Sequence, residues 1–94
     1  MQIHIRIYGR VQGVGFRAWT VRQALDLHLV GFVRNRRDGS VEVLAHGEND
    51  SLSTLLQRCL SGPTFSRVDK VEPMSCPDAP MPQLTDTFIS CHTV

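Results

Sequence analysis

The sequence is poor in cysteine and contains no long apolar run. Its 94 residues include 3 cysteines, whose wide spacing forms neither a C-x-x-C pair nor a zinc-ligand pattern. No apolar stretch approaches the roughly 20 residues that cross a bilayer. His4, Arg6 and Arg10 interrupt the N-terminal segment where a secretion signal would carry its apolar core. These absences argue against a disulfide-rich or membrane-inserted protein, and we expect a cytoplasmic protein with no membrane partner.

The overall composition is that of an ordinary globular domain, with 41% apolar and 20% charged residues. A chain of 94 residues buries roughly 60–65% of its unfolded surface on folding, so it needs neither disulfides nor metal ions to form a core. The sequence has no internal repeat and no low-complexity tract. We therefore expect residues 1–94 to form a single domain and to act as a monomer.

Acidic residues are scarce in the first part of the chain. Residues 1–37 carry seven Lys or Arg against one acid, Asp26, a net charge of +6, whereas residues 38–94 carry three against eight, a net charge of −5. Such asymmetry favours an anion-binding surface. The overall charge of only +1 does not indicate the broad basic face that a long nucleic acid needs. The charge pattern predicts a small anionic ligand and no nucleic-acid partner.

Hydrophobic periodicity predicts the first strand and the first helix. Isoleucines alternate with polar residues over 3–7, the period-two pattern of a half-buried strand. The period then becomes helical over residues 16–28. The apolar face of that helix comprises Phe16, Thr20, Ala24 and Leu27. Apolar runs at 29–34 and 41–45 predict two further strands, and Asp38-Gly39 between them is a hairpin signal.

The second helix has the clearest pattern in the chain. Its apolar positions follow i, i+3, i+4, i+7 and i+8 at Leu52, Leu55, Leu56, Cys59 and Leu60. Asp50 or Ser51 is expected to cap its start, and Gly62-Pro63 to end it. Cys59 should therefore be a buried thiol, whereas Cys76 and Cys91 show no pattern that gives them a role. Residues 66–72 predict a strand, 74–86 a proline-rich loop and 87–92 a last strand.

The order βαββαβ predicts an α+β, ferredoxin-like sandwich, an antiparallel sheet with two helices on one face. Right-handed crossovers place the first and third strands in the centre. The first and second strands then run parallel, so their carboxyl ends meet the same sheet edge. The first ends at a glycine-bearing loop and the second at Asn35. Two strand spacings separate them by about 10 Å, which side chains can span around a phosphate-sized ligand.

The glycine-bearing loop over residues 9–17 is the most informative segment. Glycines at 9, 13 and 15 allow positive φ, and the backbone N–H groups of such a loop and of the helix after it favour an anion. Arg17, in the first helical turn, can grip two oxygens of that anion. The loop lacks the endings of a P-loop and of a dinucleotide fingerprint. The alternative is a plain strand-to-helix turn with an exposed arginine.

The residues near this edge also limit the chemistry. Carboxylates that could hold magnesium are missing, since Asp26 lies well into the first helix and the hairpin turn explains Asp38. We therefore expect no metal and no cofactor. What remains is an anion cradle, Arg17 and the amide of Asn35, which suffices for transfer of a phosphoryl group to water. An acyl phosphate suits this site because its leaving group is already a stable carboxylate.

Three separated motifs resemble the acylphosphatases. Residues 9–17 read G-R-V-Q-G-V-G-F-R, residues 31–35 read G-F-V-R-N, and residues 38–42 read D-G-S-V-E. The resemblance runs from about residue 3 to residue 72. It implies a cytoplasmic, cofactor-free hydrolase of acyl phosphates in which Arg17 binds phosphate and Asn35 holds the catalytic water. It also implies a phosphate loop formed by Arg10, Val11, Gln12, Gly13, Val14, Gly15 and Phe16.

Two other functions fit parts of the pattern. A similar loop opens the hydrogenase-maturation carbamoyltransferases, so a carbamoyl-phosphate-handling or anion-binding module is an alternative. In those proteins the arginine that corresponds to Arg17 is typically followed by proline, whereas in this chain Ala18 follows Arg17. RNA-recognition domains share the predicted fold but display stacking aromatics on the central strands, where this chain offers only Tyr8. The physiological acyl group cannot be predicted from these residues.

Several other side chains suggest function but have simpler explanations. Trp19 is expected to pack at the margin of the first helix, and His4 and His46 to lie on the solvated sheet face without partners. Arg34, Arg36 and Arg37 are expected to be solvated, where their field can speed capture of an anion. Arg10 can either assist phosphate binding or remain merely exposed.

Overall fold

The elements follow one another in the predicted order. The computed structural model describes residues 1–74, 87–91 and 93. Within these residues the elements are β1 (Gln2–Arg10), α1 (Phe16–Asp26), β2 (Val30–Asn35), β3 (Val41–His46), α2 (Asn49–Ser61), β4 (Arg67–Pro73) and β5 (Phe88–Ser90). The ferredoxin-like βαββαβ order is confirmed, and the predicted last strand follows it. The predicted loop over 74–86 lies, apart from residue 74, outside the described residues, as does Cys76.

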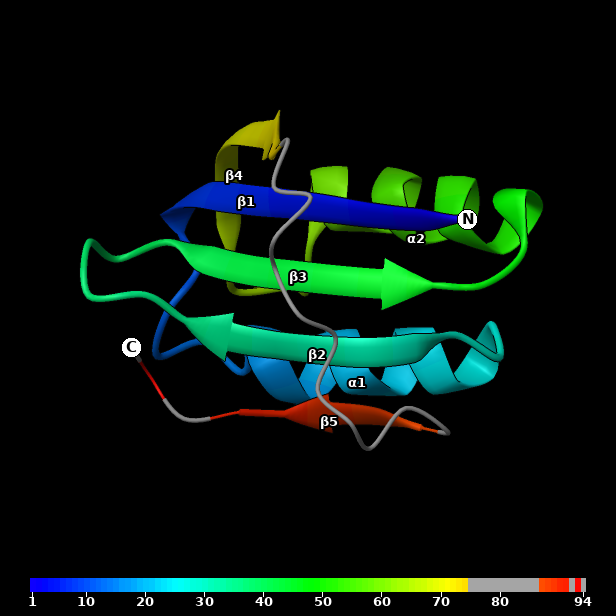
Figure 1. Cartoon of the computed structure of the whole chain (residues 1–94). Helices are drawn as coiled ribbons and strands as arrows, with labels where there is room; N and C mark the ends of the chain where they lie inside the picture. The colour runs from blue at the N-terminus through cyan, green and yellow to red at the C-terminus, as the bar shows by residue number, and fades with distance from the viewer. Residues whose placement is uncertain (75–86, 92, 94) are drawn as a thin grey trace.

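The sheet has the order β4-β1-β3-β2-β5, and both helices cover the same face (Figure 1). β1 pairs antiparallel with β3 and β4, and β2 pairs antiparallel with β3, as predicted. The sheet is nevertheless mixed, because β5 lies parallel to β2, with Gly31 opposite Phe88 and Val33 opposite Ser90. The expectation of a wholly antiparallel sheet was therefore wrong at this edge. β5 occupies the outer edge of β2, which the four-stranded core leaves open.

The core lies between the helices and the sheet. Ile5, Ile7 and Val43 point inward from the central strands, and Phe16 and Leu55 meet them from the two helices. Burial on this scale is the main stabilising contribution in a domain of this size. Trp19 packs at the margin of this core, as predicted, with its ring centroid 5.4 Å from that of Phe16.

The second helix differs from its prediction at its start and on one face. α2 begins at Asn49, with Glu48 in the N-cap position and no side-chain capping bond, so neither Asp50 nor Ser51 is the cap. The chain leaves β3 at His46 and therefore enters the helix earlier than the capping pattern suggested. Leu60 is 49% exposed, although it belongs to the apolar stripe that the sequence predicted. Gly62 ends the helix as predicted.

Cys59 is buried, as its helical position predicted. Burial raises the pKa of its thiol to about 12. Cys91 is only partly buried and has no disulfide partner among the described residues. Neither described helix has the length and apolar character needed to cross a bilayer.

The chain direction of the strands sets the location of the site. β1 and β2 both run antiparallel to β3, and β5 runs with β2, so the carboxyl ends of these three strands lie at one end of the sheet, on the left in Figure 1. Gly9 ends the regular part of β1, where the pairing with β4 shifts register. A Cβ there would collide with the carbonyl of Arg67, and φ is +132°. Only glycine therefore lets the chain leave β1 at this point.

Candidate active site

The loop between β1 and α1 exposes backbone donors at the start of the helix. Gly13 and Gly15 have φ of +74° and +80°, and Gly15 is the N-cap residue in the left-handed conformation. A Cβ at either glycine would meet open space, so the positive φ itself, and no crowding, favours glycine. No side chain caps α1. The first N–H groups of the helix therefore remain available to an anion.

Arg17 lies in this first helical turn and is half buried. Its Nη1 donates to the peptide oxygen of Cys91 at 3.2 Å, which ties α1 to the segment just after β5. A guanidinium has five N–H donors. One contact to a carbonyl therefore leaves most of the fork free to bind a second group.

A pocket of about 320 Å³ opens beside Arg17. Its lining residues are Val11, Gly13, Gly15, Phe16, Arg17, Ala18, Asn35 and Ser90. Val11 and Phe16 are buried and supply apolar walls, whereas Arg17 and Asn35 supply the charged and amide groups. The pocket thus brings together two polar residues that the sequence analysis assigned to one site from different elements.

The predicted phosphate-loop residues do not all face the pocket. Arg10 is exposed and lies opposite Arg67 in the β1–β4 pairing, outside the pocket lining. Val14 packs against the core. Gln12 turns away toward the β2–β3 hairpin, where its Nε2 donates to the carbonyls of Arg36 at 2.7 Å and Ser40 at 2.8 Å. Gln12 therefore anchors the loop to the neighbouring hairpin.

Three contributions to the site were missed by sequence reasoning. Ala18 and Ser90 line the pocket, and the carbonyl of Cys91 accepts from Arg17. Ser90 and Cys91 reach the site because β5 pairs in parallel with β2. The sequence indicated a strand near residues 87–92 but carried no signal for its neighbour. Ala18 is one position beyond Arg17 in the first helical turn, and helical geometry alone could have suggested it.

The β2–β3 hairpin that borders the site is built as predicted around Asp38 and Gly39. The Arg36 N–H donates to the Ser40 carbonyl at 2.8 Å, and Gly39 has φ of +94°. Oδ1 of Asp38 accepts from the Ser40 hydroxyl at 2.6 Å and from its N–H at 2.9 Å. These hydrogen bonds lower the pKa of the Asp38 carboxyl. The turn is therefore fixed from within.

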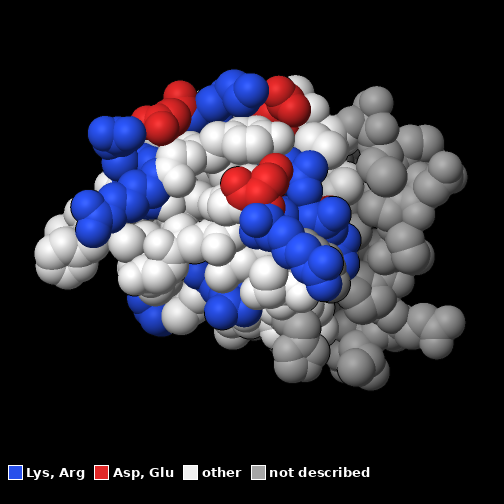
Figure 2. Space-filling model, turned by 90° about the vertical axis from the view of Figure 1, so that its left-hand side faces the viewer, with Lys and Arg blue, Asp and Glu red and all other residues white. Residues whose placement is uncertain are grey.

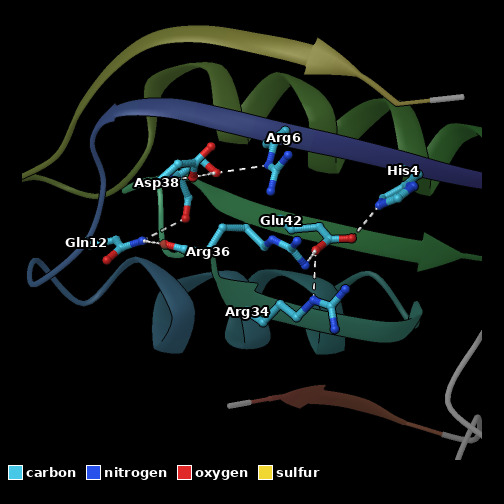
Figure 3. A network of polar contacts seen from close by, with 8 residues as sticks. His4, Arg6, Gln12, Arg34, Arg36, Asp38 and Glu42 are labelled. Carbon is cyan, nitrogen blue, oxygen red and sulfur yellow. Dashed lines mark hydrogen bonds and ion pairs between the residues drawn. The ribbon is translucent and has the colours of Figure 1, made fainter. Parts of the chain in front are cut away.

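A buried ion cluster lies on the sheet face away from the helices, beside the hairpin (Figure 3). Glu42 is 6% exposed and accepts from His4 Nε2 at 2.6 Å, from Arg34 Nε at 2.7 Å and from Arg36 Nη1 at 3.1 Å. Burial raises the pKa of Glu42, but the hydrogen bonds from Arg34 and His4 outweigh it and leave the pKa below its ordinary value. The carboxylate is therefore ionised at neutral pH.

This cluster corrects two expectations from the sequence. His4 does lie on the predicted sheet face, but its side chain is only 7% exposed and it has a partner, Glu42. Arg34 and Arg36 are ion-paired with Glu42 instead of freely solvated. Strand alternation could place these side chains on one face, but it could not show that they converge on one carboxylate. Arg37 and His46 are exposed, as expected.

The end of the molecule that carries the pocket is rich in positive charge. Figure 2 looks at this end and shows Lys and Arg side chains spread over it, with few Asp and Glu side chains among them. The basic residues at the end of β1, in the first turn of α1 and in the hairpin are Arg10, Arg17, Arg36 and Arg37, of which Arg36 is ion-paired with Glu42. Such a field attracts anions and speeds their capture. Among the described residues, no group of three or more His, Cys, Asp or Glu side chains could hold a metal ion.

Backbone donors at a helix start, one arginine fork and one amide lie together at the end of a ferredoxin-like sheet, and this arrangement is typical of small α+β proteins with a site suited to a tetrahedral anion. The comparisons with known proteins name the family within this class. The family model for acylphosphatase matches residues 3–84. The chain belongs to the acylphosphatase family.

Curated relatives and solved structures agree with this assignment. The acylphosphatase of Nitrobacter winogradskyi is 54% identical over 68 residues, covering 72% of this chain and 69% of the relative. That of Rhodospirillum rubrum is 49% identical over 78 residues, covering 81% and 86%. The crystal structure of acylphosphatase from Bacillus subtilis superposes with a TM-score of 0.84 at 33% identity, covering 96% of this chain and 97% of that one. The chain is an enzyme of this type, a hydrolase of acyl phosphates.

A second group of structures shares the fold. Full-length HypF in a phosphate- and nucleotide-bound form superposes with a TM-score of 0.82 at 22% identity. The match covers 98% of this chain but 12% of HypF. This likeness shows the fold alone, whereas the acylphosphatases match over most of their own length.

Proposed function

We propose that this hydrolase binds the phosphoryl group of its substrate with Arg17 and the loop over residues 10–16, and that Asn35 orients the attacking water. Among the loop residues, we assign direct contact to the backbone of Gly13 to Phe16 and an anchoring role to Gln12. The observation that carries the proposal is that Arg17, Asn35 and the loop glycines line one pocket.

The chemistry needs no further catalytic group. Water attacks phosphorus, the bond between phosphorus and the acyl oxygen breaks, and the carboxylate leaves with the bonding electrons. The new phosphate keeps the water oxygen, and the surplus proton passes to solvent. Because the transition state is loose, positioning and stabilisation of the phosphoryl oxygens account for most of the catalysis. Arg17 and the N–H groups at the start of α1 would supply that stabilisation.

The burial and the hydrogen bonding of Asn35 support its role in orienting the attacking water. It is half buried at the end of β2, and its side chain makes no hydrogen bond to another described residue. An amide carries both a donor and an acceptor, so it can hold a water in one orientation. Ordering that water beside phosphorus would contribute part of the roughly 7–11 kcal/mol that proximity and orientation can supply.

We further propose that the chain works as a single cytoplasmic domain, as a monomer and without a cofactor. The pocket has apolar walls from Val11 and Phe16, beyond which the acyl group would project.

A role in carbamoyl-phosphate handling is the alternative. It rests on the fold shared with HypF, whereas the identity to relatives named acylphosphatase favours acyl-phosphate hydrolysis.

The direct test is hydrolysis of benzoyl phosphate by the purified protein with excess EDTA present. We expect turnover that inorganic phosphate inhibits competitively, because phosphate would occupy the same cradle. Asn35→Ala should lower kcat on the order of 100-fold and leave the inhibition constant of phosphate nearly unchanged. An absolute requirement for a divalent metal, or an Asn35→Ala variant with the kcat of the parent protein, would overturn the assignments.

A further inference from the structure

Glu42 connects three neighbouring segments on the sheet face opposite the pocket. It lies on β3, and its carboxylate receives hydrogen bonds from β1 through His4, from β2 through Arg34 and from the hairpin through Arg36 (Figure 3). The side chain of Glu42 is 8% exposed, so water screens these contacts weakly. A buried carboxylate held by three donors is a rigid point in the sheet.

Two of these donors flank Asn35 in the sequence. Arg34 and Arg36 point to the Glu42 face, and strand alternation directs Asn35 to the other face, where it lines the pocket. Oε1 of Glu42 accepts from both arginines, at 2.7 Å and 3.1 Å. One oxygen atom therefore holds the residues immediately before and after Asn35. This contact restrains the backbone from which the Asn35 amide projects.

The same cluster reaches the phosphate loop through Arg36. While its guanidinium binds Glu42, its peptide carbonyl accepts from Nε2 of Gln12 at 2.7 Å. The Ser40 carbonyl, opposite Arg36 in the turn, accepts from the same Gln12 nitrogen at 2.8 Å. The order of contacts is therefore Glu42, Arg36, Gln12 and then the loop. It joins the two halves of the pocket, the loop with Arg17 and the strand end with Asn35.

We propose that Glu42 is a positioning residue for hydrolysis: by holding Arg34 and Arg36 it fixes the Asn35 amide relative to the phosphate loop. The inference rests on the proposed role of Asn35. Glu42 is not among the residues that line the pocket, and its hydrogen-bond partners in the described part of the chain are His4, Arg34 and Arg36. Its effect would therefore reach the water through Asn35 and not the phosphoryl group directly.

Glutamine at position 42 should break this arrangement with little change of shape. Its amide is uncharged and has one acceptor oxygen and one NH₂ group, whereas the Glu42 carboxylate is charged and accepts with both oxygens. An NH₂ group that faces the arginines cannot accept from them, and one that faces His4 leaves them a neutral carbonyl, so the charge–charge attraction to Arg34 and Arg36 is lost in either case. Because an error of 1 Å at a reacting group can cost 100-fold, Glu42→Gln should lower kcat by about 10- to 100-fold. KM and the inhibition constant of inorganic phosphate should change less than threefold.

The matched control is Glu72→Gln, the same substitution on the same sheet face. Glu72 lies opposite Arg6 in the β1–β4 pairing and contacts Lys70, so it is independent of Arg34 and Arg36. Calorimetric titration with inorganic phosphate gives the fraction of each preparation that is folded and competent. We expect full stoichiometry in both variants and a low kcat in Glu42→Gln alone. If Glu42→Gln does not fold, Arg36→Gln tests the same link, and we expect a similar loss of kcat.

Combination with Asn35→Ala separates positioning from a general structural effect. If Glu42 acts through Asn35, adding Glu42→Gln to Asn35→Ala should lower kcat no further. The side-chain ¹H–¹⁵N signals of Asn35, assigned by their loss in Asn35→Ala, should shift in Glu42→Gln and stay in place in Glu72→Gln. A kcat for Glu42→Gln within twofold of the parent, or equal losses in both backgrounds, would overturn the inference. A fully active Asn35→Ala variant would instead overturn the proposed role of Asn35.

Discussion

Nη1 of Arg17 donates a hydrogen bond to the peptide oxygen of Cys91, 74 positions further along the chain, at 3.2 Å. The contact fixes one side of the guanidinium plane and leaves its remaining donors for a ligand. It also makes the segment after β5 part of the site, although no side chain there is needed for it. The orientation of this arginine thus depends on the pairing of β5 with β2.

Arg17→Lys should lower kcat/KM by about 100- to 1,000-fold, which corresponds to roughly 2.7–4 kcal/mol of transition-state stabilisation. Lysine keeps the charge but cannot bind a carbonyl and two phosphoryl oxygens in one plane. Steady-state hydrolysis of benzoyl phosphate measures the effect. Arg22→Lys, on the exposed side of the same helix, is the control and should match the parent. If Arg17→Lys kept the kcat/KM of the parent protein, the proposed binding of the phosphoryl oxygens by the Arg17 guanidinium would be contradicted.

Cys91→Ala and Cys91→Pro should behave differently. Alanine preserves the carbonyl that accepts from Arg17, so activity should stay within twofold of the parent. Proline removes the Cys91 N–H, which donates to the Val33 carbonyl at 2.9 Å and holds the end of β5 on β2. We expect a lower Tm and at least a tenfold lower kcat/KM for proline. Thermal unfolding and kinetics of the two variants check this, and a strong defect in Cys91→Ala would show that the thiol matters instead.

The thiol of Cys59 should resist labelling in the folded protein. With its pKa raised to about 12 by burial, only about one molecule in ten thousand carries the thiolate at pH 8, and the side chain has no access to solvent. Iodoacetamide at pH 8 should therefore modify the partly exposed Cys91 and spare Cys59, as read by peptide mass spectrometry. In guanidinium chloride both should react. Rapid native labelling of Cys59 would mean that α2 opens readily.

Stability should fall in acid partly because of Glu42. Its pKa is lowered from the ordinary value of 4.5 on folding, so its contribution is fully present above that value. The contribution is lost as pH falls through the lowered folded pKa, because the unfolded chain binds the proton first. Urea unfolding between pH 6 and pH 3 should show this decline, and Glu42→Gln should show a shallower one. Parallel curves for the two proteins would contradict the assignment.

Gly31→Ala should destabilise the sheet strongly. Gly31 has φ of +139°, and a Cβ there would collide with the carbonyl of Leu44 on the neighbouring strand. We expect a loss of about 3 kcal/mol or more in the free energy of unfolding. Gly39→Ala is the control, since φ is +94° but a Cβ would meet open space, and it should cost about 1–2 kcal/mol. If urea unfolding gave the same loss of unfolding free energy for Gly31→Ala and Gly39→Ala, the neighbouring strand would have to move to make room for the Cβ at residue 31.

Sequence periodicity was sufficient to predict the elements that carry the site. The alternation around Ile5, the helical face of Phe16 and the turn at Gly39 each rest on local physics, and right-handed crossovers then leave one arrangement for β1, β2 and β3. That arrangement by itself predicts that Arg17 and Asn35 lie at one end of the sheet. The positive φ of Gly13 and Gly15 was equally predictable, because the loop is short and rich in glycine.

The parts that could not be predicted depend on pairings between distant segments. No local pattern shows which edge of the sheet a three-residue strand such as β5 pairs with. The contact from Arg17 to Cys91 could therefore not be predicted from the sequence. The convergence of His4, Arg34 and Arg36 on Glu42 likewise depends on strand register, which fixes whether like charges repel or share a counter-ion. A buried carboxylate flanked by arginines is read from a sequence only after that register is known.

The two hydrogen bonds from Gln12 to the hairpin carbonyls hold the loop by contacts within the protein, without any contribution from a ligand. The entropic cost of ordering the loop is therefore met once, when the protein folds, and not at each encounter with substrate. A preorganised cradle should bind inorganic phosphate with little change in backbone hydrogen exchange. The binding free energy from substrate contacts is then available to stabilise the transition state, because none of it is needed to order the loop.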